Sequence, residues 1–532
     1  MGLQTLHWTN PYRSSRTPIL GANVVSTSQP LAAQAGLRML LRGGNAVDAA
    51  VAAAIALTVV EPTMTGVGGD AFALVWDGTS LHGLNASGRA PRAWNARMFE
   101  GLQEMPALGW PSVTVPGAVS SWVALSRRFG VLPFAELFAP AIEYAERGFP
   151  VSPFVARTWK EMGEKYRAFP SFVETFLPGG RAPATGDVFR YDALGSTLGE
   201  IADTYGESFY RGRLARAIAA FSSETGGLLH EDDLAGHTPE WVEPVSVDFG
   251  DYTIHEMPPN SQGIAALIAL ALLRDEGISE LHPDSVESVE LQLKAMFVAH
   301  TDVRARVTDP VHMDCDAAWM LSDQHLSDLR RVMDERPQSP SDRSGGSSGG
   351  DTVFLTAADS SGMMVSLIQS NYFDFGSGLV VPGTGISLHS RAALFNVDPG
   401  HPNVVAGAKR PFHTLSPAFL SSRGRPVMSF GVMGGPMQPQ GHVQTLLRVC
   451  TQGQNPQAAC DAPRWHVTAA GEVLLEEGFS KSVYGGLTGR GHRVQRLEYG
   501  DPVFGGGQFI LRTEGGYCAA SDPRRDGQAV AF

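Results

Sequence analysis

A threonine stands where a Gly/Ser tether ends and a strand-like run begins, and this junction could perform chemistry. The segment "SDRSGGSSGGDTVFLTAADSSG" starts at Ser341, and its Gly/Ser run stops at Asp351. A threonine hydroxyl becomes a nucleophile when its own α-amine, freed by cleavage of the preceding peptide bond, accepts the hydroxyl proton. An acylated nitrogen is no base, whereas a free α-amine has an ordinary pKa of about 8. Thr352 is therefore a candidate nucleophile, and the Asp351–Thr352 bond is a candidate cleavage site.

A second hydroxyl is expected close to the first. The runs "TVFLTAA" and "MMVSLIQSNY" flank a four-residue turn sequence, which predicts an antiparallel hairpin. If Ala358 pairs with Met363, Ser370 lies beside Thr352 to within one residue of register. A Gly/Ser linker before a strand that begins with threonine is also common, so the pattern alone leaves a plain structural linker as the alternative.

The elements that must position these hydroxyls belong to a large mixed α/β chain. Its 532 residues exceed the roughly 250 to 300 at which a single core stops growing, so one very large layered domain or two closely joined parts are expected. The expected elements are helices at 30–41 (opened by Ser28 and Pro30), 46–60 (capped by Asn45) and within 119–148; strands at 71–76 and after the two-residue turn Asp77-Gly78; a largely helical part at 150–330 with strands near 241–256; a flexible linker at 337–351; and short strands and turns from Thr352 onward.

The composition excludes several classes of partner. A formal net charge of -13, without a local cluster of basic residues, argues against nucleic acid. The longest apolar run, 46–60, contains Asp48 and is too short to cross a bilayer, and the first residues lack the apolar core of a signal peptide. The four cysteines show no metal-binding or disulfide spacing. We therefore expect a cytoplasmic protein with no metal, no cofactor and no membrane contact.

Several long motifs, in order along the chain, give a resemblance to a known family. The motifs are "RGGNAVDAAVAAAIALTVVEPTMTGVGGDAFALVWDG", "VTVPGAVSSWVALSRRFGVLPFAELFAPAIEYAERGFPVS", "FYRGRLARAI", "MPPNSQG", "GVMGGPMQ" and "SDPRRDGQAV". Together they resemble the γ-glutamyltransferase (glutathione hydrolase) family of N-terminal-nucleophile (Ntn) hydrolases. The resemblance implies a four-layer αββα sandwich, made as a proenzyme that cleaves itself before a threonine.

The resemblance also implies roles for residues in and around the hairpin. The cut would leave a large subunit, 1–351, and a small subunit, 352–532, which stay associated; a pair of such heterodimers is a further alternative. Thr352 would attack first the Asp351 carbonyl and later a substrate amide. Ser370 takes the place of a second threonine that binds the nucleophile, and the backbone N–H groups of Gly434 and Gly435 would stabilise the oxyanion.

The residues that would bind substrate depart from the family pattern. The arginine of the family's glutamyl-binding segment is replaced by Ser87, with Arg89 two residues later. The acidic residue for the substrate's α-amine falls near Leu394, which cannot pair with an ammonium, whereas Arg391 could bind a carboxylate through two hydrogen bonds. Surface ion pairing is the alternative for both arginines.

Other pocket positions differ as well. The family's two adjacent serines become His413 and Thr414, and its asparagine near the nucleophile falls at Asn371 or Tyr372, depending on register. We expect His413 to pack or to form hydrogen bonds rather than act as a second base. A lid loop that other members carry is shortened after Asn403, which favours water over an amine as the acceptor.

Three functions follow from these observations. The first is an autoprocessing amidohydrolase for a γ-glutamyl or related carboxylate-bearing amide, acting by hydrolysis or transfer. The second uses the same machinery on a small-molecule donor without an α-amine, such as oxamate or a glutaryl or cephalosporin-type amide. The third is an unprocessed binding protein, which the altered substrate residues suggest and the retained Thr352, Ser370, Gly434 and Gly435 oppose.

Overall fold

The computed structural model describes residues 16–335 and 351–532 as one continuous fold. The flexible linker predicted at 337–351 falls outside the described residues, except that the backbone of Asp351 begins strand β10. Two seven-stranded sheets form the centre, in the orders β21-β2-β10-β11-β3-β4-β7 and β1-β20-β19-β15-β14-β9-β8.

The strands of the first sheet are β21 (Gln528–Ala531), β2 (Val24–Thr27), β10 (Asp351–Ala358), β11 (Met364–Tyr372), β3 (Asp70–Trp76), β4 (Leu81–Asn85) and β7 (Glu240–Val242). The strands of the second sheet are β1 (Ile19–Gly21), β20 (Gly516–Ser521), β19 (Gly506–Thr513), β15 (Arg425–Met433), β14 (Ala418–Ser422), β9 (Tyr252–Glu256) and β8 (Val245–Phe249). Smaller sheets contain β5 (Phe149–Pro150), β6 (Val188–Phe189), β12 (Val380–Val381), β13 (Ile386–Ser387), β16 (Trp465–Val467), β17 (Val473–Glu476) and β18 (Val494–Leu497).

The helices fall into two groups along the chain. The first group is α1 (Pro30–Leu41), α2 (Ala46–Val60), α3 (Ala118–Phe129), α4 (Ala139–Arg147), α5 (Pro153–Gly163), α6 (Pro170–Phe176), α7 (Asp192–Asp203), α8 (Glu207–Arg211), α9 (Arg213–Glu224) and α10 (Glu231–Ala235). The second group is α11 (Ile264–Leu273), α12 (Val286–Arg306), α13 (Ala317–Met320), α14 (Asp323–Glu335), α15 (Met437–Leu446), α16 (Pro456–Asp461) and α17 (Lys481–Gly489).

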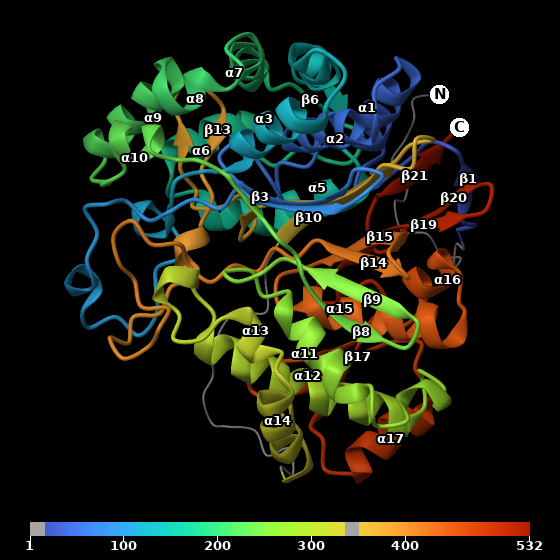
Figure 1. Cartoon of the computed structure of the whole chain (residues 1–532). Helices are drawn as coiled ribbons and strands as arrows, with labels where there is room; N and C mark the ends of the chain where they lie inside the picture. Colours follow the sequence, from blue (N-terminus) through green and yellow to red (C-terminus); the bar gives the residue numbers. More distant parts are fainter. Residues whose placement is uncertain (1–15, 336–350) are drawn as a thin grey trace.

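Three hydrophobic cores show that these elements form four layers. One core joins the first helices to the outer face of the first sheet, a second joins α11, α12 and α15 to the outer face of the second sheet, and a third lies between the sheets. Figure 1 shows the same order, with α1–α3 and α7–α9 above, the two sheets in the middle, and α11, α12 and α15 below. The αββα prediction is confirmed.

Alternation along β10 assigns its side chains to these cores. Val353 and Leu355 belong to the core under the helices, whereas Phe354 and Ala358 lie between the sheets. Because side chains alternate along a strand, Thr352 also faces the space between the sheets. The second sheet supplies the other wall of that space, where the Thr356 hydroxyl lies 2.6 Å from the Ser429 hydroxyl.

The predicted helices α1 and α2 are confirmed, with one change at a cap. Asn45 caps α2 in a reciprocal capping box with Asp48, and every residue of this alanine-rich helix is buried. Gln29, and not Ser28, caps α1 by accepting from the N–H groups of the first turn. Ser28 instead donates to the buried carboxylate of Glu61.

Two turns differ from expectation because polar side chains organise longer loops. Trp76 pairs with Leu81, so four residues connect β3 and β4, and the Asp77 carboxylate accepts from the N–H groups inside the loop. The predicted two-residue turn was therefore wrong. Ala358 pairs with Met364 and not with Met363, which shifts the β10–β11 register by one residue.

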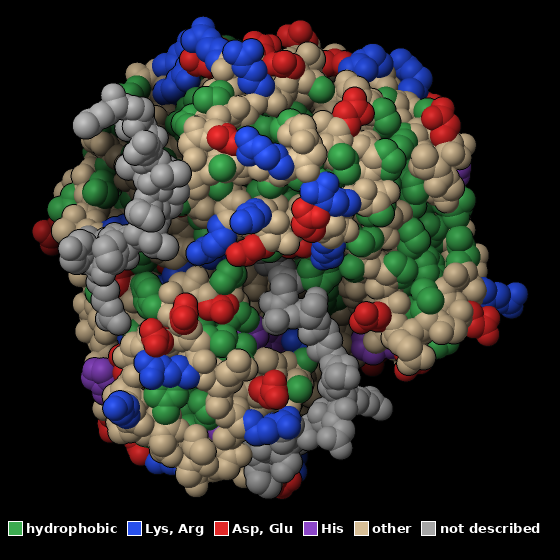
Figure 2. Space-filling model, turned by 180° about the vertical axis from the view of Figure 1, so that it is seen from behind, with side chains coloured by type: hydrophobic (Ala, Val, Ile, Leu, Met, Phe, Trp, Pro, Cys, Tyr) green, Lys and Arg blue, Asp and Glu red, His purple; other side chains and the backbone are tan. Residues whose placement is uncertain are grey.

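The second part of the chain contains more helix than predicted, since α15, α16 and α17 interrupt its strands. No helix in the described ranges is long and apolar enough to cross a membrane. Seen from behind, the surface mixes basic and acidic side chains with scattered hydrophobic ones (Figure 2).

Candidate active site

Thr352 lies at the start of β10 and its hydroxyl contacts Ser370. The distance between Thr352 Oγ1 and Ser370 Oγ is 3.3 Å, and both side chains are buried in the uncleaved chain. Ser370 Oγ also accepts a 2.7 Å hydrogen bond from the N–H of Tyr372. Pairing between the strands shifts between Asp351 and Val353, so Thr352 sits at a backbone irregularity. The structure thus brings the two predicted hydroxyls together beside the predicted scissile bond.

The Gly434-Gly435 turn follows β15, a strand of the second sheet. It connects β15 to α15, and both glycines have positive φ, +123° and +55°. The Gly434 carbonyl accepts from the N–H of Met437 in α15. Because C=O and the next N–H are antiparallel in a trans peptide, the Gly435 N–H points away from α15. This orientation suits a donor to a developing oxyanion.

Replacing Gly434 by Ala should slow both self-cleavage and turnover by about 10²- to 10³-fold. A Cβ here would lie 3.0 Å from Gly505 Cα, at a φ of +123° that side chains rarely adopt, so the turn must move. Gly424→Ala is the matched control, because Gly424 has a φ of +72° at the far end of β15 with open space around it. The measurements are cleavage half-time by electrophoresis and kcat; equal rates in the two variants would contradict the assignment.

Arg391 is a buried charged residue in this region. Its side chain is fully buried, its guanidinium lies 4.8 Å over the Tyr372 ring, and Nη1 donates to Thr414 Oγ1 at 3.0 Å. Within the described part of the chain, its Nε and Nη2 have no hydrogen-bond acceptor. Burial lowers the pKa of Arg391 to about 10, with Asp70 opposing the shift, so the group keeps its charge at neutral pH. A buried cation with unused donors is costly unless an anion binds it.

Asp70 holds the opposite charge behind Arg391. It begins β3, pairs with Ser370 in the sheet, and lies 3.9 Å from Arg391 Nε. One carboxylate oxygen accepts from the N–H of Gly117 at 3.0 Å, and the other lies 3.2 Å from His413 Nε2. Burial would raise the pKa of Asp70, but His389, His413 and Arg391 outweigh it and lower the pKa to about 2.

His413 is fully buried, and its ring contacts the Asp70 carboxylate. Burial and the Arg391 charge lower its pKa to about 3. The N–H of Leu415 donates to Nδ1, so the ring proton sits on Nε2 and is donated to Asp70. Thr414, the next residue, contacts Arg391 directly. The two changed positions therefore help to fix the Arg391–Asp70 pair.

Tyr372 and Asn371 contact different parts of the protein. The Tyr372 ring lies under the Arg391 guanidinium, whereas Asn371 donates to Ser387 Oγ at 3.3 Å. Asn371 Oδ1 is buried without a partner among the described residues. The Tyr372 N–H donates to Ser370 Oγ, and no comparable contact joins Asn371 to Ser370 or Thr352 among the described residues.

Arg89 is placed differently from Arg391. Its guanidinium is partly exposed, lies 2.5 Å from Asp309, and donates to the Ala408 carbonyl. In the described ranges its contacts are with these groups and Glu240, and not with the Thr352–Arg391 cluster. The ion-pair alternative describes Arg89 as the structure shows it.

Two residues of this site were not predicted from the sequence. Asp70 stands in "GVGGDAF" as a single acid before a strand, without a periodic signal. Gln262, in the quoted motif "MPPNSQG", donates to the Thr414 carbonyl at 2.7 Å and to the Gly435 carbonyl at 2.8 Å. It thereby connects the Arg391 side of the site to the glycine turn. In the part of the chain that the structure describes, no three His, Cys, Asp or Glu residues gather as a metal site.

Comparisons with known proteins agree with this arrangement. The family model described as gamma-glutamyltranspeptidase matches residues 32–532. A glutathione hydrolase-like proenzyme of Bacillus subtilis and an oxamate amidohydrolase proenzyme of Klebsiella pneumoniae are each 35% identical, covering 94% of this chain and 97% of their own. A cephalosporin acylase structure from Bacillus halodurans is 44% identical, with a TM-score of 0.93 and 99% of both chains covered. The chain belongs to the gamma-glutamyltranspeptidase family and is a hydrolase of the Ntn type.

Proposed function

We propose that this protein is a self-cleaving amidohydrolase whose substrate carries a carboxylate, and no ammonium, on its acyl half. The observation that carries the proposal is Arg391, a buried guanidinium beside Tyr372 with unused donors. A carboxylate is the anion whose geometry matches this planar fork.

Self-cleavage would start with attack of Thr352 Oγ1 on the Asp351 carbonyl carbon. The C–N bond breaks, the nitrogen takes a proton and becomes the α-amine of Thr352, and the Asp351 acyl group moves to the hydroxyl as an ester. Water then hydrolyses the ester and leaves chains 1–351 and 352–532. Ser370 Oγ, held by the Tyr372 N–H, fixes the attacking hydroxyl.

Substrate turnover would repeat this chemistry on an external amide. The free α-amine accepts the Thr352 hydroxyl proton, the oxygen attacks the amide carbonyl, and the Gly435 N–H stabilises the oxyanion. The proton passes to the departing amine, and water hydrolyses the acyl-enzyme. Water, and not an amine, is proposed as the usual acceptor.

The electrostatics favour an acyl group without an α-amine. A γ-glutamyl donor brings an ammonium that needs an anionic partner. The carboxylate next to Arg391 is Asp70, whose oxygens already accept from Gly117 and His413. A glutaryl or oxamyl group needs only the cation. The names of the oxamate amidohydrolase and cephalosporin acylase relatives support this choice.

A panel of 4-nitroanilides tests the proposal. The purified protein should show two chains by intact mass, the smaller one starting at Thr352, and should hydrolyse the glutaryl anilide at least about tenfold faster than the γ-glutamyl anilide. The pentanoyl anilide, which lacks the carboxylate, should react slowest. Faster hydrolysis of γ-glutamyl anilide would overturn the donor assignment, and an intact single chain would overturn the mechanism.

A further inference from the structure

A groove of about 1050 Å³ runs along α5, outside the Thr352–Arg391 cluster. Six cationic residues line it, against the two acids Glu164 and Asp526. We call it the cationic groove and define it by Arg157, Lys160, Arg167, Arg181, Arg524 and Arg525.

Two of these cations keep their charge available for a ligand. Arg157 and Lys160 are exposed and lie three residues apart on one face of α5. Arg157 lies over the Phe154 ring at 5.3 Å. Neither forms an ion pair within the described residues, and the Asp526 carboxylate accepts instead from the N–H of Phe154 at 2.9 Å.

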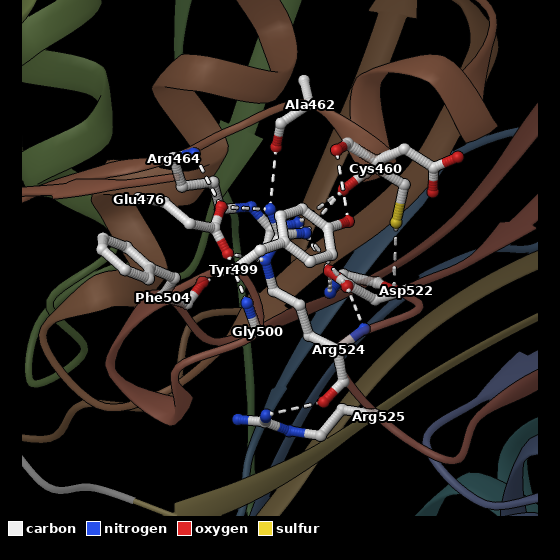
Figure 3. A network of polar contacts seen from close by, with 12 residues as sticks. Cys460, Ala462, Arg464, Glu476, Tyr499, Gly500, Phe504, Asp522, Arg524 and Arg525 are labelled. Carbon is white, nitrogen blue, oxygen red and sulfur yellow. Dashed lines mark hydrogen bonds and ion pairs between the residues drawn. The ribbon is translucent and has the colours of Figure 1, made fainter. Parts of the chain in front are cut away.

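The floor of the groove is held by a buried charge network (Figure 3). Arg524 is fully buried and pairs with Glu476 and with Asp522, whose other oxygen lies 2.6 Å from Arg464. The Tyr499 ring covers Arg524 at 4.6 Å. Such a satisfied network gives the segment that carries Arg525 one fixed conformation.

The inner end of the groove adjoins the predicted oxyanion turn. A Cβ built on Gly506 would lie 2.8 Å from both Arg525 Cγ and Met433 Cε. Met433 is the residue before Gly434, and Gly434 itself packs against Gly505. The side chains of Arg525 and Met433 therefore meet at Gly506, and Met433 directly precedes the Gly434-Gly435 turn.

The order of the strands puts the groove and Arg391 on opposite sides of Thr352. In the first sheet, β10 lies between β2-β21 and β11-β3; Asp526 precedes β21, whereas Tyr372 and Asp70 belong to β11 and β3. In the second sheet, β15 lies between β19, which begins at Gly506, and β14, which follows Thr414. Across the strands of both sheets, the order is therefore the same: the cationic groove comes first, the reaction centre next, and Arg391 last.

An amide has two halves on opposite sides of its carbonyl carbon. If the acyl half extends toward Arg391, the amine half must extend toward the groove. We infer that the cationic groove receives the leaving amine half of the substrate, and that this half carries a carboxylate or similar anionic group. The inference rests on the proposed amidase activity and adds that the substrate is anionic at both ends.

A matched pair of anilides tests this inference in the processed enzyme. Glutaryl-3-carboxy-4-nitroanilide differs from glutaryl-4-nitroanilide by one carboxylate on the leaving group. Wild-type kcat/KM should be about five- to tenfold higher for the carboxylated anilide, as expected for contact with two exposed cations. The preference should fall with salt, because the Debye length shrinks from about 10 Å at 0.1 M to about 3 Å at 1 M.

Reversing the charges of Arg157 and Lys160 tests whether the preference for the carboxylated anilide arises in the cationic groove. Arg157→Glu/Lys160→Glu should lower the ratio of the two kcat/KM values at least about fivefold. Arg97→Glu/Lys481→Glu makes the same change in net charge at exposed residues outside the groove and should keep the wild-type ratio. Equal ratios in both double variants, or a wild-type preference for the uncharged leaving group, would overturn the inference.

A binding measurement separates this inference from the proposed function. The product amine, 5-amino-2-nitrobenzoate, should bind the wild type and lose at least about fivefold in affinity in Arg157→Glu/Lys160→Glu. If neither anilide is hydrolysed, the proposed function fails, and the binding result alone decides the groove. Unchanged affinity in the charge-reversed variant would reject it.

Discussion

Thr352→Ala should leave a single chain of 56.8 kDa and lower kcat/KM on the order of 10⁴-fold or more. The substitution removes Oγ1, the atom 3.3 Å from Ser370 Oγ, and keeps the Cβ that packs in β10. Without this oxygen neither the Asp351 carbonyl nor a substrate amide has a nucleophile. Thr352→Ser should restore slow cleavage because the hydroxyl returns. Denaturing electrophoresis, intact mass and the glutaryl anilide assay measure the result.

Thr356→Ala is the matched control for this experiment. Thr356 lies on the same face of the same strand, and its hydroxyl bonds the Ser429 hydroxyl across the sheets at 2.6 Å. Its loss should cost about 1 kcal/mol of stability without stopping cleavage. If Thr352→Ala is still cut at the same bond, another residue is the nucleophile. If the wild type itself stays uncut, the unprocessed binding protein becomes the better explanation.

Local patterns were sufficient to predict the hairpin that carries Thr352 and Ser370. Alternating apolar residues identified β10 and β11, and the Gly/Ser break before Thr352 marked where β10 begins. The one-residue error in register arose because the loop after Ala358 is longer than a four-residue turn: the N–H of Asp359 donates to the Met363 carbonyl, so pairing starts at Met364. Because side chains alternate with a two-residue period, this shift changes every pairing: Val353 lies opposite Gln369 and not Ile368.

The charged cluster around Asp70 could not be predicted in this way. Asp70 lies far along the sequence from His389, Arg391 and His413, and it meets them only through tertiary packing. A lone Asp at the start of a strand has no local signal, and its role appears only through its partners. Arg391 was identified as a candidate by its residue type; its burial and its contact with Tyr372 depend on tertiary packing.

Arg391→Met should lower kcat/KM for the glutaryl anilide about 10²-fold, or ~3 kcal/mol, and affect the pentanoyl anilide much less. The guanidinium would otherwise give a substrate carboxylate two charge-assisted hydrogen bonds in a buried site. Arg391→Lys keeps the charge but loses the planar fork, so its kcat/KM for the glutaryl anilide should lie between those of the wild type and Arg391→Met. The ratio of the two substrates is the readout, because it does not depend on how much of each variant folds.

Arg89→Met is the comparison that decides between the two arginines considered as carboxylate ligands. Arg89 already pairs with Asp309 at 2.5 Å, so its removal should leave the glutaryl-to-pentanoyl ratio near the wild-type value. A collapse of the ratio in Arg89→Met, with little change in Arg391→Met, would move the carboxylate site to the Arg89–Asp309 pair. A collapse in Arg391→Met alone would mean that the cation buried against Tyr372, and not the partly exposed Arg89, selects the acyl group.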